Sequence, residues 1–496
     1  MLTDEIIKQV LAEFPFDPTA EQTRAIATLA AFLTDPNPRS VMILRGSAGT
    51  GKTALAGAIV RMLTLRRQRV LLLAPTGRAA KVFAMTSGHE AFTIHRRIYR
   101  ERTFTGVGGE FNLNDNLYRN TLFMVDESSM IGMAAEGSPF GSGRLLDDLV
   151  SYVYQGASDR LLLIGDRAQL PPVGEEESPA LSDEVMAGYG LKVWSADLNE
   201  VLRQAHDSGI LFNATVVRNM LLRGEADGLP RIRFSGFADI VRVAGDELIE
   251  ALSSSYSEVG IDETMVITRS NKRAHIYNQG IRNTVLDRED MISGGDMLMV
   301  VKNNYYWTEK EAAEKNGNDK RDGNKDEGDE STRLPFIANG DRAEVMRVYN
   351  GREFYGFHFA DAWLRFPDYD DYEMEATIML DSLVSEAPSL TREQNEALFN
   401  GVAEDYADVP LKRDRMDKIR NDSYFNALQV KFAYAITCHK AQGGQWSHVY
   451  VDQGYMTADM LTPDYLHWLY TAFTRATGKL FLVNWPEEQT CGGESD

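Results

Sequence analysis

The sequence predicts an α/β fold built on parallel sheets. Four apolar runs have the length of buried strands, and polar loops follow them: 41–44, 70–74, 122–125 and 161–164. Helical patterns alternate with these runs, and strands that alternate with helices form parallel sheets. Ligands bind such sheets beyond the carboxyl ends of the strands. The polar loops are therefore expected along one ligand-binding edge.

The loop after the first run has the sequence of a phosphate-binding loop. It fits G-x-x-x-x-G-K-[ST], and a helical pattern follows it. In such a loop, backbone N–H groups and a helix N-terminus surround an anion, and glycines permit the close approach. Lysine then reaches the β/γ-phosphates and threonine binds Mg²⁺. The predicted nucleoside triphosphate and Mg²⁺ site consists of Gly46, Ala48, Gly49, Thr50, Gly51, Lys52 and Thr53.

Carboxylates follow the third run, as hydrolysis at a phosphate loop requires. Asp126 and Glu127 come directly after residues 122–125. Asp126 suits the shell of Mg²⁺, and Glu127 suits the positioning of water, although acidic residues also begin helices. Gln169 follows the fourth run and is placed to contact the γ-phosphate or water.

Composition indicates an ordinary globular protein of two to four domains. The chain has 496 residues and only two cysteines, Cys438 and Cys491, so we expect a reducing compartment and a cytoplasmic location. The first twenty residues are not those of a signal peptide, and no apolar run is long enough to cross a membrane.

The net charge of −21 argues against non-specific coating of nucleic acid, but it does not exclude a local basic groove. Basic clusters lie at 66–69, 78–81 and 96–102. Acidic residues gather elsewhere, at 361–375 and within 309–333, and the second stretch is predicted to be a mobile loop.

Three polar residues have two interpretations each. Gln22 stands three residues after Thr19, so it either completes a capping box or contacts adenine, and capping is the commoner role. Thr76 and His95 lie at the ligand edge, where they are either a turn cap and a surface histidine or ligand contacts.

In residues 103–111, polar and apolar side chains alternate, a glycine-rich turn follows, and the alternation then resumes. This pattern predicts a β-hairpin. A hairpin inserted into a strand–helix series is expected to project. Phe104 and Phe111 lie on it, and it is either a functional projection or a plain surface hairpin.

Six ordered segments resemble the motifs of superfamily 1 helicases. The Gln-Leu-Pro-Pro sequence at 169–172 is most similar to the RecD/Dda-type branch, which moves 5′ to 3′. Gln445 departs from many relatives, which carry a glutamate there. The segments resembling motifs I to VI are residues 46–53, 126–130, 165–173, 198–204, 435–445 and 469–476.

The resemblance implies two RecA-like domains that bind ATP and Mg²⁺ between them. It implies that Arg203 and Arg475 act as arginine fingers, whereas Arg475 by itself indicates a charge at a helix C-terminus. It also favours Gln22 as an adenine contact and Gly443 of motif V at the nucleotide. Contacts to single-stranded DNA are implied for Thr76, His95, Thr437 and His439.

The expected organisation has a first RecA-like domain at 1–196 with the hairpin at about 98–120. A second RecA-like domain comprises 197–348 and 430–496, interrupted at 349–429 by a module that resembles a small SH3-like β-barrel. We expect a monomer that translocates on single-stranded DNA and splits DNA junctions with Phe104 or Phe111. The alternatives are a translocase or clamp within a larger recombination or repair complex, and an RNA motor.

Overall fold

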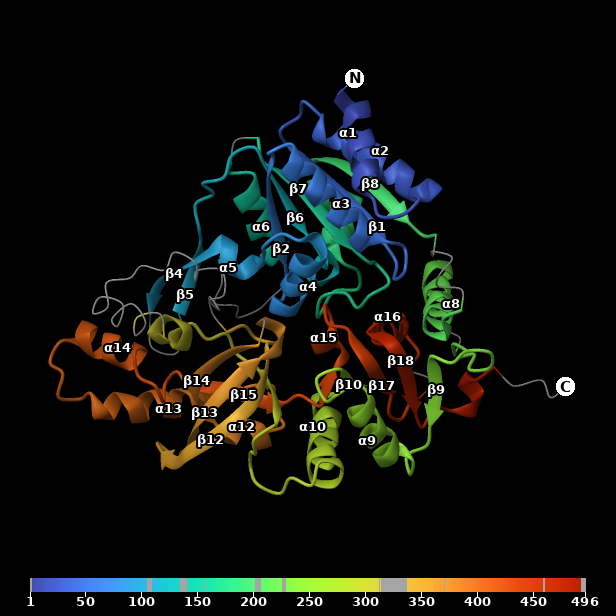
Figure 1. The fold of residues 1–496 in the computed structure, drawn as a ribbon. Helices are drawn as coiled ribbons and strands as arrows, with labels where there is room; N and C mark the ends of the chain where they lie inside the picture. Colours follow the sequence, from blue (N-terminus) through green and yellow to red (C-terminus); the bar gives the residue numbers. More distant parts are fainter. Residues whose placement is uncertain are drawn as a thin grey trace. The chain divides into compact units, whose positions relative to one another are not determined.

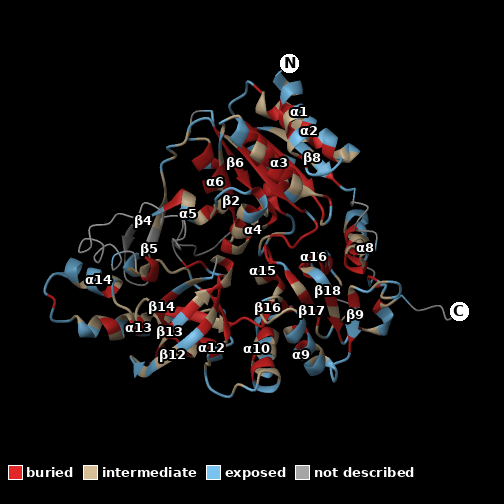
Figure 2. Ribbon diagram, viewed as in Figure 1, coloured by how far each residue is buried: buried red, intermediate tan, exposed pale blue. Residues whose placement is uncertain are grey.

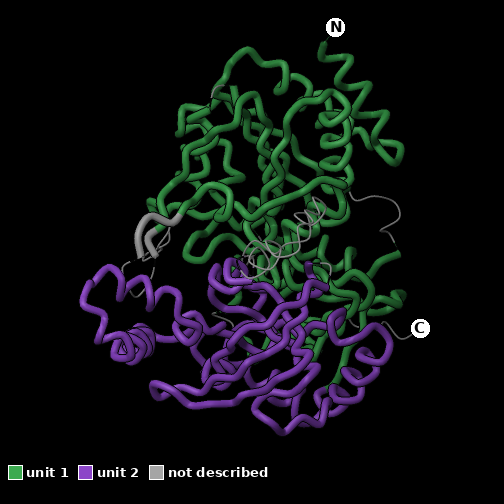
Figure 3. Tube along the Cα trace, turned by 60° about the vertical axis from the view of Figure 1, so that its left-hand side comes forward, with its two compact units in different colours: residues 1–102, 110–244, 441–496 green, residues 103–109, 245–440 purple. Residues whose placement is uncertain are grey.

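The structure is a computed structural model of the chain. It describes residues 2–104, 109–133, 141–156, 158–200, 207–224, 229–311, 313, 337–369, 371–457 and 460–491. Arg203, the side chain of Phe104 and most of the predicted loop at 309–333 lie outside the described residues. The chain divides into two compact units (Figure 3): unit 1 has residues 1–102, 110–244 and 441–496, and unit 2 has residues 103–109 and 245–440.

Unit 1 contains a six-stranded sheet in which every neighbouring pair of strands is parallel (Figure 1). The four apolar runs form four of its strands, which confirms the predicted α/β class. In sheet order the strands are β3 (Ala91–Thr93), β2 (Arg69–Ala74), β6 (Thr121–Val125), β7 (Arg160–Gly165), β1 (Ser40–Gly46) and β8 (Lys192–Leu198).

Helices cover both faces of this sheet because its central strands are apolar on both sides. Met42 and Leu44 of β1 pack into one core cluster, and Val41 and Ile43 pack into the other. Figure 2 shows these central strands as buried. On the first face lie α1 (Leu2–Glu13), α2 (Ala20–Leu33) and α3 (Lys52–Leu65); on the second lie α5 (Ile94–Ile98), α6 (Leu145–Val153) and α7 (Asp183–Gly188).

A second group of parallel strands in unit 1 comes from two distant stretches of sequence. β17 (Trp446–Asp452) pairs in parallel with β18 (Ala476–Val483), and β18 pairs in parallel with β9 (Ile240–Val243). The other elements are α4 (Gly77–Ser87), α8 (Gly209–Arg223), α16 (Pro463–Phe473) and the hairpin strands β4 (Tyr99–Phe104) and β5 (Gly109–Leu113). Helix α8 packs against α16.

Unit 2 combines a parallel strand pair with a closed barrel. β10 (Thr264–Thr268) pairs in parallel with β16 (Ala435–Thr437), between the helices α9 (Leu248–Glu258), α10 (Asn271–Gly280) and α15 (Cys438–Ala441). Ser270 caps α10, because its hydroxyl accepts a hydrogen bond from the Arg273 N–H. A residue at Ncap needs a non-helical backbone, and Ser270 has one (φ −142°, ψ 151°).

The barrel confirms the expected small β-module, and it extends beyond residues 349–429. Helices α13 and α14 join its last two strands and pack on Phe357, Phe359 and Met379. The helices inserted here are α12 (Asp381–Val384), α13 (Arg392–Asp405) and α14 (Lys412–Arg420). The strands are β11 (Met297–Val300), β12 (Arg342–Phe354), β13 (Phe357–Phe366), β14 (Tyr372–Met379) and β15 (Leu428–Phe432).

Candidate functional site

The phosphate loop joins β1 to α3, as the motif requires. Gly49 and Gly51 have φ of 76° and 82°, a region in which a side chain would be strained. A Cβ on Gly46 would lie 2.8 Å from both Lys52 Cγ and Thr50 Oγ1. The Lys52 Nζ donates to the carbonyls of Gly46 (2.5 Å) and Ser47 (3.0 Å), so the ammonium group is held at the start of the loop.

Gln22 completes a capping box and also holds the phosphate loop. Its Oε1 accepts the Thr19 N–H at 2.9 Å, and its Nε2 donates to the Thr50 carbonyl at 2.9 Å. The capping interpretation is therefore correct. The second hydrogen bond also fixes α2 to the loop, so a residue with a local role supports the candidate nucleotide site.

Asp126 and Glu127 follow β6 with unusual local properties. Burial and the neighbouring Glu127 charge raise the pKa of Asp126 to about 7, although Lys52 opposes the shift. Glu127 has φ 49°, the left-handed region, and such backbone strain is concentrated at functional sites. Among the described residues no group of three or more histidine, cysteine or acidic side chains could hold a metal ion. One carboxylate beside a phosphate loop nevertheless suits Mg²⁺, which takes ligands from substrate phosphates.

Arg475 lies directly after α16 and close to Glu127. Its Nη1 is 4.0 Å from the Glu127 Oε1 and donates to the Gly444 carbonyl at 3.2 Å. Its Nε donates to the Thr471 carbonyl at 3.1 Å, which closes the C-terminal turn of α16. The two interpretations of Arg475, an arginine finger and a charge at a helix C-terminus, are thus compatible. The side chain lies at the end of α16 and also beside the predicted catalytic carboxylate.

Tyr470 of α16 connects the phosphate loop to the loop after β7, and sequence reasoning missed it. Its hydroxyl accepts the Ala48 N–H at 2.9 Å and donates to the Asp166 Oδ2 at 2.6 Å. Burial and Asp166 raise the pKa of Tyr470 well above its ordinary value, so the hydroxyl remains a donor. A tyrosine inside the segment that resembles motif VI was the available signal.

Gln169 lies in the same loop and has one amide atom without a partner. The Gln169 Oε1 is buried and accepts no hydrogen bond from the described residues. The next residue is held in place: the Leu170 N–H donates to Thr471 Oγ1 at 2.7 Å, and the Leu170 carbonyl accepts from Gln442 at 2.7 Å. A buried acceptor without a partner is costly, which fits the predicted role of Gln169 toward water.

The predicted contacts to DNA in unit 1, and Gly443, which was predicted to lie at the nucleotide, have structural roles in the folded chain. The Thr76 hydroxyl accepts the Ala79 N–H at 3.2 Å and caps α4. Gly443 approaches the same turn, where a Cβ would lie 2.9 Å from the Ala79 Cβ; this glycine packs on α4. Burial lowers the pKa of His95 to about 4, so the ring beside Tyr99 is neutral at pH 7. Phe111 packs against the core of unit 1.

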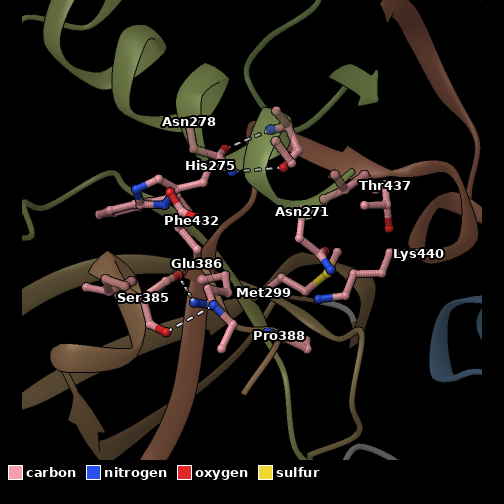
Figure 4. Close-up of a pocket in the computed structure, with 16 residues that line it drawn as sticks. Asn271, His275, Asn278, Met299, Ser385, Glu386, Pro388, Phe432, Thr437 and Lys440 are labelled. Atoms are coloured by element: carbon pink, nitrogen blue, oxygen red, sulfur yellow. Dashed lines mark hydrogen bonds between the residues drawn. The ribbon is translucent and has the colours of Figure 1, made fainter. Parts of the chain in front are cut away.

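A second candidate site lies entirely within unit 2, and it contains the predicted residue Thr437 (Figure 4). The pocket lies between α10, the β16–α15 junction and the barrel, and Lys440, Lys431 and Asn271 also line it. His439 is exposed at the same junction. Asn278, at the back of the pocket, donates to the Ala435 carbonyl and accepts from Tyr434 and Ala435 N–H groups, so its role is structural.

The two lysines of this pocket are electrostatically unusual. Desolvation and the nearby Lys440 charge lower the pKa of Lys431 to about 8, and desolvation lowers the pKa of Lys440. Neither lysine forms an ion pair with a described carboxylate, although Glu386 also lines the pocket. Lys431 donates instead to the backbone carbonyl of Ser385. Two partly buried cations that form no ion pair with a described carboxylate are suited to an anionic ligand.

Two family models match the chain, in an order that agrees with this geometry. Residues 18–219, which hold the phosphate loop and both carboxylates, match an AAA domain. Residues 432–483, which hold Thr437, Tyr470 and Arg475, match the UvrD-like helicase C-terminal domain. The chain is therefore similar to an AAA domain over the part that holds the phosphate loop, and to a UvrD-like helicase domain over the segment that holds Arg475.

Curated relatives match part of the chain. The ATP-dependent RecD2 DNA helicase of Deinococcus radiodurans is 33% identical over 188 residues, which is 38% of this chain and 22% of the relative. The uncharacterized protein MJ1519 of Methanocaldococcus jannaschii is 33% identical over 146 residues, 27% of this chain and 12% of the relative. The matches thus span less than a quarter of the length of these relatives.

Solved structures of Pif1 helicases also align with the chain. A Pif1 helicase structure that concerns unwinding at forked duplex DNA has 14% identity and a TM-score of 0.47, over 97% of this chain and 95% of the other. The Bacteroides Pif1 helicase in complex with ADP-AlF3 and single-stranded DNA has 13% identity and a TM-score of 0.46, over the same shares. In the described part of this chain, no helix has the length and apolarity needed to span a membrane.

Proposed function

We propose that the chain is an ATP-dependent DNA helicase that moves along single-stranded DNA. The observation that carries the proposal is the meeting, in one compact unit, of the phosphate loop, the Asp126–Glu127 pair and Arg475. Positioning of a triphosphate, of water and of a stabilising cation is what phosphoryl transfer needs from a protein. The match to the UvrD-like helicase C-terminal domain supports motor function over a simple nucleotide switch.

In this proposal each residue has one task during hydrolysis. Lys52 binds the β/γ-phosphates, and Thr53 with Asp126 would hold Mg²⁺, which neutralises phosphate charge when bound. Glu127 orients the attacking water, with Gln169 beside it. Arg475 stabilises charge on the transferred phosphoryl group, and Arg203 is proposed as the second arginine finger.

The domain division and the direction of travel belong to the same proposal. We assign residues 1–196 to the first RecA-like domain, 197–348 with 430–496 to the second, and the barrel region to an inserted module. Movement is 5′ to 3′, as in the resembled branch. The hairpin of β4 and β5 separates the strands of a duplex, and Phe104 is the better candidate for contact with the junction because Phe111 packs on the core.

Unit 2 supplies its own candidate contact to DNA. Lys431, Lys440 and the Thr437 hydroxyl share one pocket, and a backbone phosphate would satisfy both lysines. Contacts to phosphate do not distinguish one base from another, so binding is expected to be weakly sequence-specific and strongly dependent on salt. An RNA motor remains the second candidate, because nothing in this pocket distinguishes a 2′-hydroxyl.

The test is ATP hydrolysis by the full chain with and without single-stranded oligonucleotides of DNA and RNA. We expect DNA to stimulate turnover, and Glu127→Gln to lower the stimulated rate by about 10²–10⁴-fold while the variant still binds ATP. Unwinding of duplexes with a 5′ or a 3′ single-stranded tail then gives the direction. Equal stimulation by RNA would favour the RNA motor. Absence of any stimulation would favour a clamp or a subunit that needs a partner chain.

A further inference from the structure

Helix α8 places an arginine on the phosphate loop, outside the expected set of arginine fingers. The buried residues of α8 include Ile210, Ala214 and Val217, and Arg218 shares their face at a position where an apolar side chain would be ordinary. Arg218 is only 8% exposed. A fully charged side chain at such a position requires an explanation, because burial of an unpaired charge is costly.

The partners of Arg218 among the described residues are neutral. Its Nη1 donates to the Ser47 Oγ at 2.9 Å, and its Nη2 donates to the Asn199 side-chain carbonyl. It forms no ion pair with a described carboxylate. Two of its five N–H donors are used in this way, so the others are available to a further acceptor without loss of either hydrogen bond.

Ser47 identifies which part of a nucleotide would lie near this guanidinium. The Lys52 ammonium, which reaches the β/γ-phosphates in loops of this kind, donates to the Ser47 carbonyl at 3.0 Å. The neighbouring Ala48 N–H is held by Tyr470, and Tyr470 also donates to Asp166. Arg218 is therefore positioned at the β/γ end of the loop.

We propose that Arg218 is a nucleotide-binding residue that contacts the terminal phosphate of ATP, in addition to Arg203 and Arg475. The proposal rests on the proposed ATPase function of the same loop. Its physical basis is charge compensation: a buried guanidinium with only neutral partners gains a charged acceptor when the triphosphate binds. Helix α8 would then sense the nucleotide directly.

The experiment compares Arg218→Leu and Arg218→Lys with the parent chain, using a fluorescent non-hydrolysable ATP analogue and ADP, each with Mg²⁺. We expect Arg218→Leu to weaken analogue binding by about 10–100-fold and ADP binding by less. Arg218→Lys keeps the charge and should recover part of the loss. Arg223→Ala, an exposed arginine in the last turn of α8, is the matched control.

Thermal unfolding without nucleotide separates ligand binding from a structural role. If Arg218 serves the ligand, Arg218→Leu keeps or raises the melting temperature of the free protein but lowers the increase that the ATP analogue produces. A lower melting temperature of the free protein with normal analogue affinity would overturn the proposal. Equal losses for the analogue and ADP would overturn the assignment to the terminal phosphate. If the parent chain itself binds no nucleotide, the proposed ATPase function fails instead.

Discussion

The phosphate loop of unit 1 and the lysine pocket of unit 2 are both proposed as anion sites, but they are built differently. In the loop, backbone N–H groups and one lysine surround the site; a hydrogen bond that Gln22 donates and one that Tyr470 accepts fix its shape. In the pocket, Lys431 and Lys440 supply charge from different elements at a cost in desolvation. The loop therefore has a sequence signature, whereas the pocket depends on the fold to bring its lysines together.

This difference predicts how activity or affinity changes when one charge is removed from each site. A preorganised catalytic site loses activity steeply when one charge is removed, because that charge acts on the transition state. A phosphate pocket loses affinity in smaller steps, because each lysine contributes separately. Five substitution or titration experiments sharpen the comparison.

The largest effect is expected for Arg475→Ala. Removal of a cation that stabilises the transferred phosphoryl group should lower DNA-stimulated kcat by about 10³–10⁵-fold, with smaller effects on KM for ATP. Arg475→Lys keeps a charge but lacks the guanidinium that donates to the Thr471 and Gly444 carbonyls together, so it should recover only part of the rate. Thermal unfolding of both variants controls for the helix-terminating role. A kcat within tenfold of the parent in Arg475→Ala would remove this residue from catalysis.

The lysine pocket is tested by Lys431→Met and Lys440→Met. Each should weaken binding of a single-stranded oligonucleotide by about tenfold, since each removes one charge-assisted contact to phosphate. In the double variant, the slope of log affinity against log salt should fall by about 1.4, as expected for two phosphate contacts. Lys412→Met, at an exposed position of α14, is the matched control. Unchanged affinity and salt slope in the double variant would show that DNA does not use this pocket.

The pH dependence of oligonucleotide binding tests the contribution of Lys431. Its pKa is lowered to about 8, so the charged form that attracts phosphate prevails below pH 8 and is lost as the pH rises above it. Oligonucleotide affinity should therefore fall several-fold between pH 7 and 9.5, measured at constant salt. Lys431→Arg should abolish this dependence because arginine stays charged.

The lowered pKa of Lys431 also predicts how the free energy of unfolding changes with pH. The folded-state pKa lies below the unfolded value, so the folded chain binds fewer protons between about pH 8 and 10.5. The contribution of Lys431 to the free energy of unfolding should then rise with pH across that window. A contribution that falls across it, judged against Lys431→Met, would contradict the assigned desolvation.

The smallest effect separates the two roles of Gln22. Thr19→Ala and Gln22→Ala both break the capping box and should each destabilise the chain by about 1 kcal/mol. Only Gln22→Ala also loses the hydrogen bond to Thr50, so it alone should weaken ATP binding, by about fivefold. A comparison of ATP with GTP tests the adenine contact: loss of the parent's preference for ATP in Gln22→Ala would support it, and an unchanged preference would exclude it.

Much of the fold was predictable because its signals are local. The four apolar strand runs, the glycines of the phosphate loop and the Thr19–Gln22 cap each depend on residues a few positions apart, and all are present as expected. The cap of α10 is not decided by local signals, because both Ser270 and Asn271 are suitable caps and the backbone geometry selects Ser270. The barrel was expected, but its first strand at 297–300 was not, because a strand of four residues lacks a measurable period.

The sequence alone determined the chemistry that we propose for unit 1, since the order of residues in the loop and at Asp126–Glu127 fixes their local geometry. Tertiary structure alone decided which distant residues complete that site. Tyr470 meets Ala48, Arg475 approaches Glu127, and Arg218 reaches Ser47, each across more than 150 positions of sequence. The same holds for the pocket of Lys431 and Lys440 with Asn271. Such contacts follow from the packing of whole helices and sheets, which no local pattern of side chains specifies.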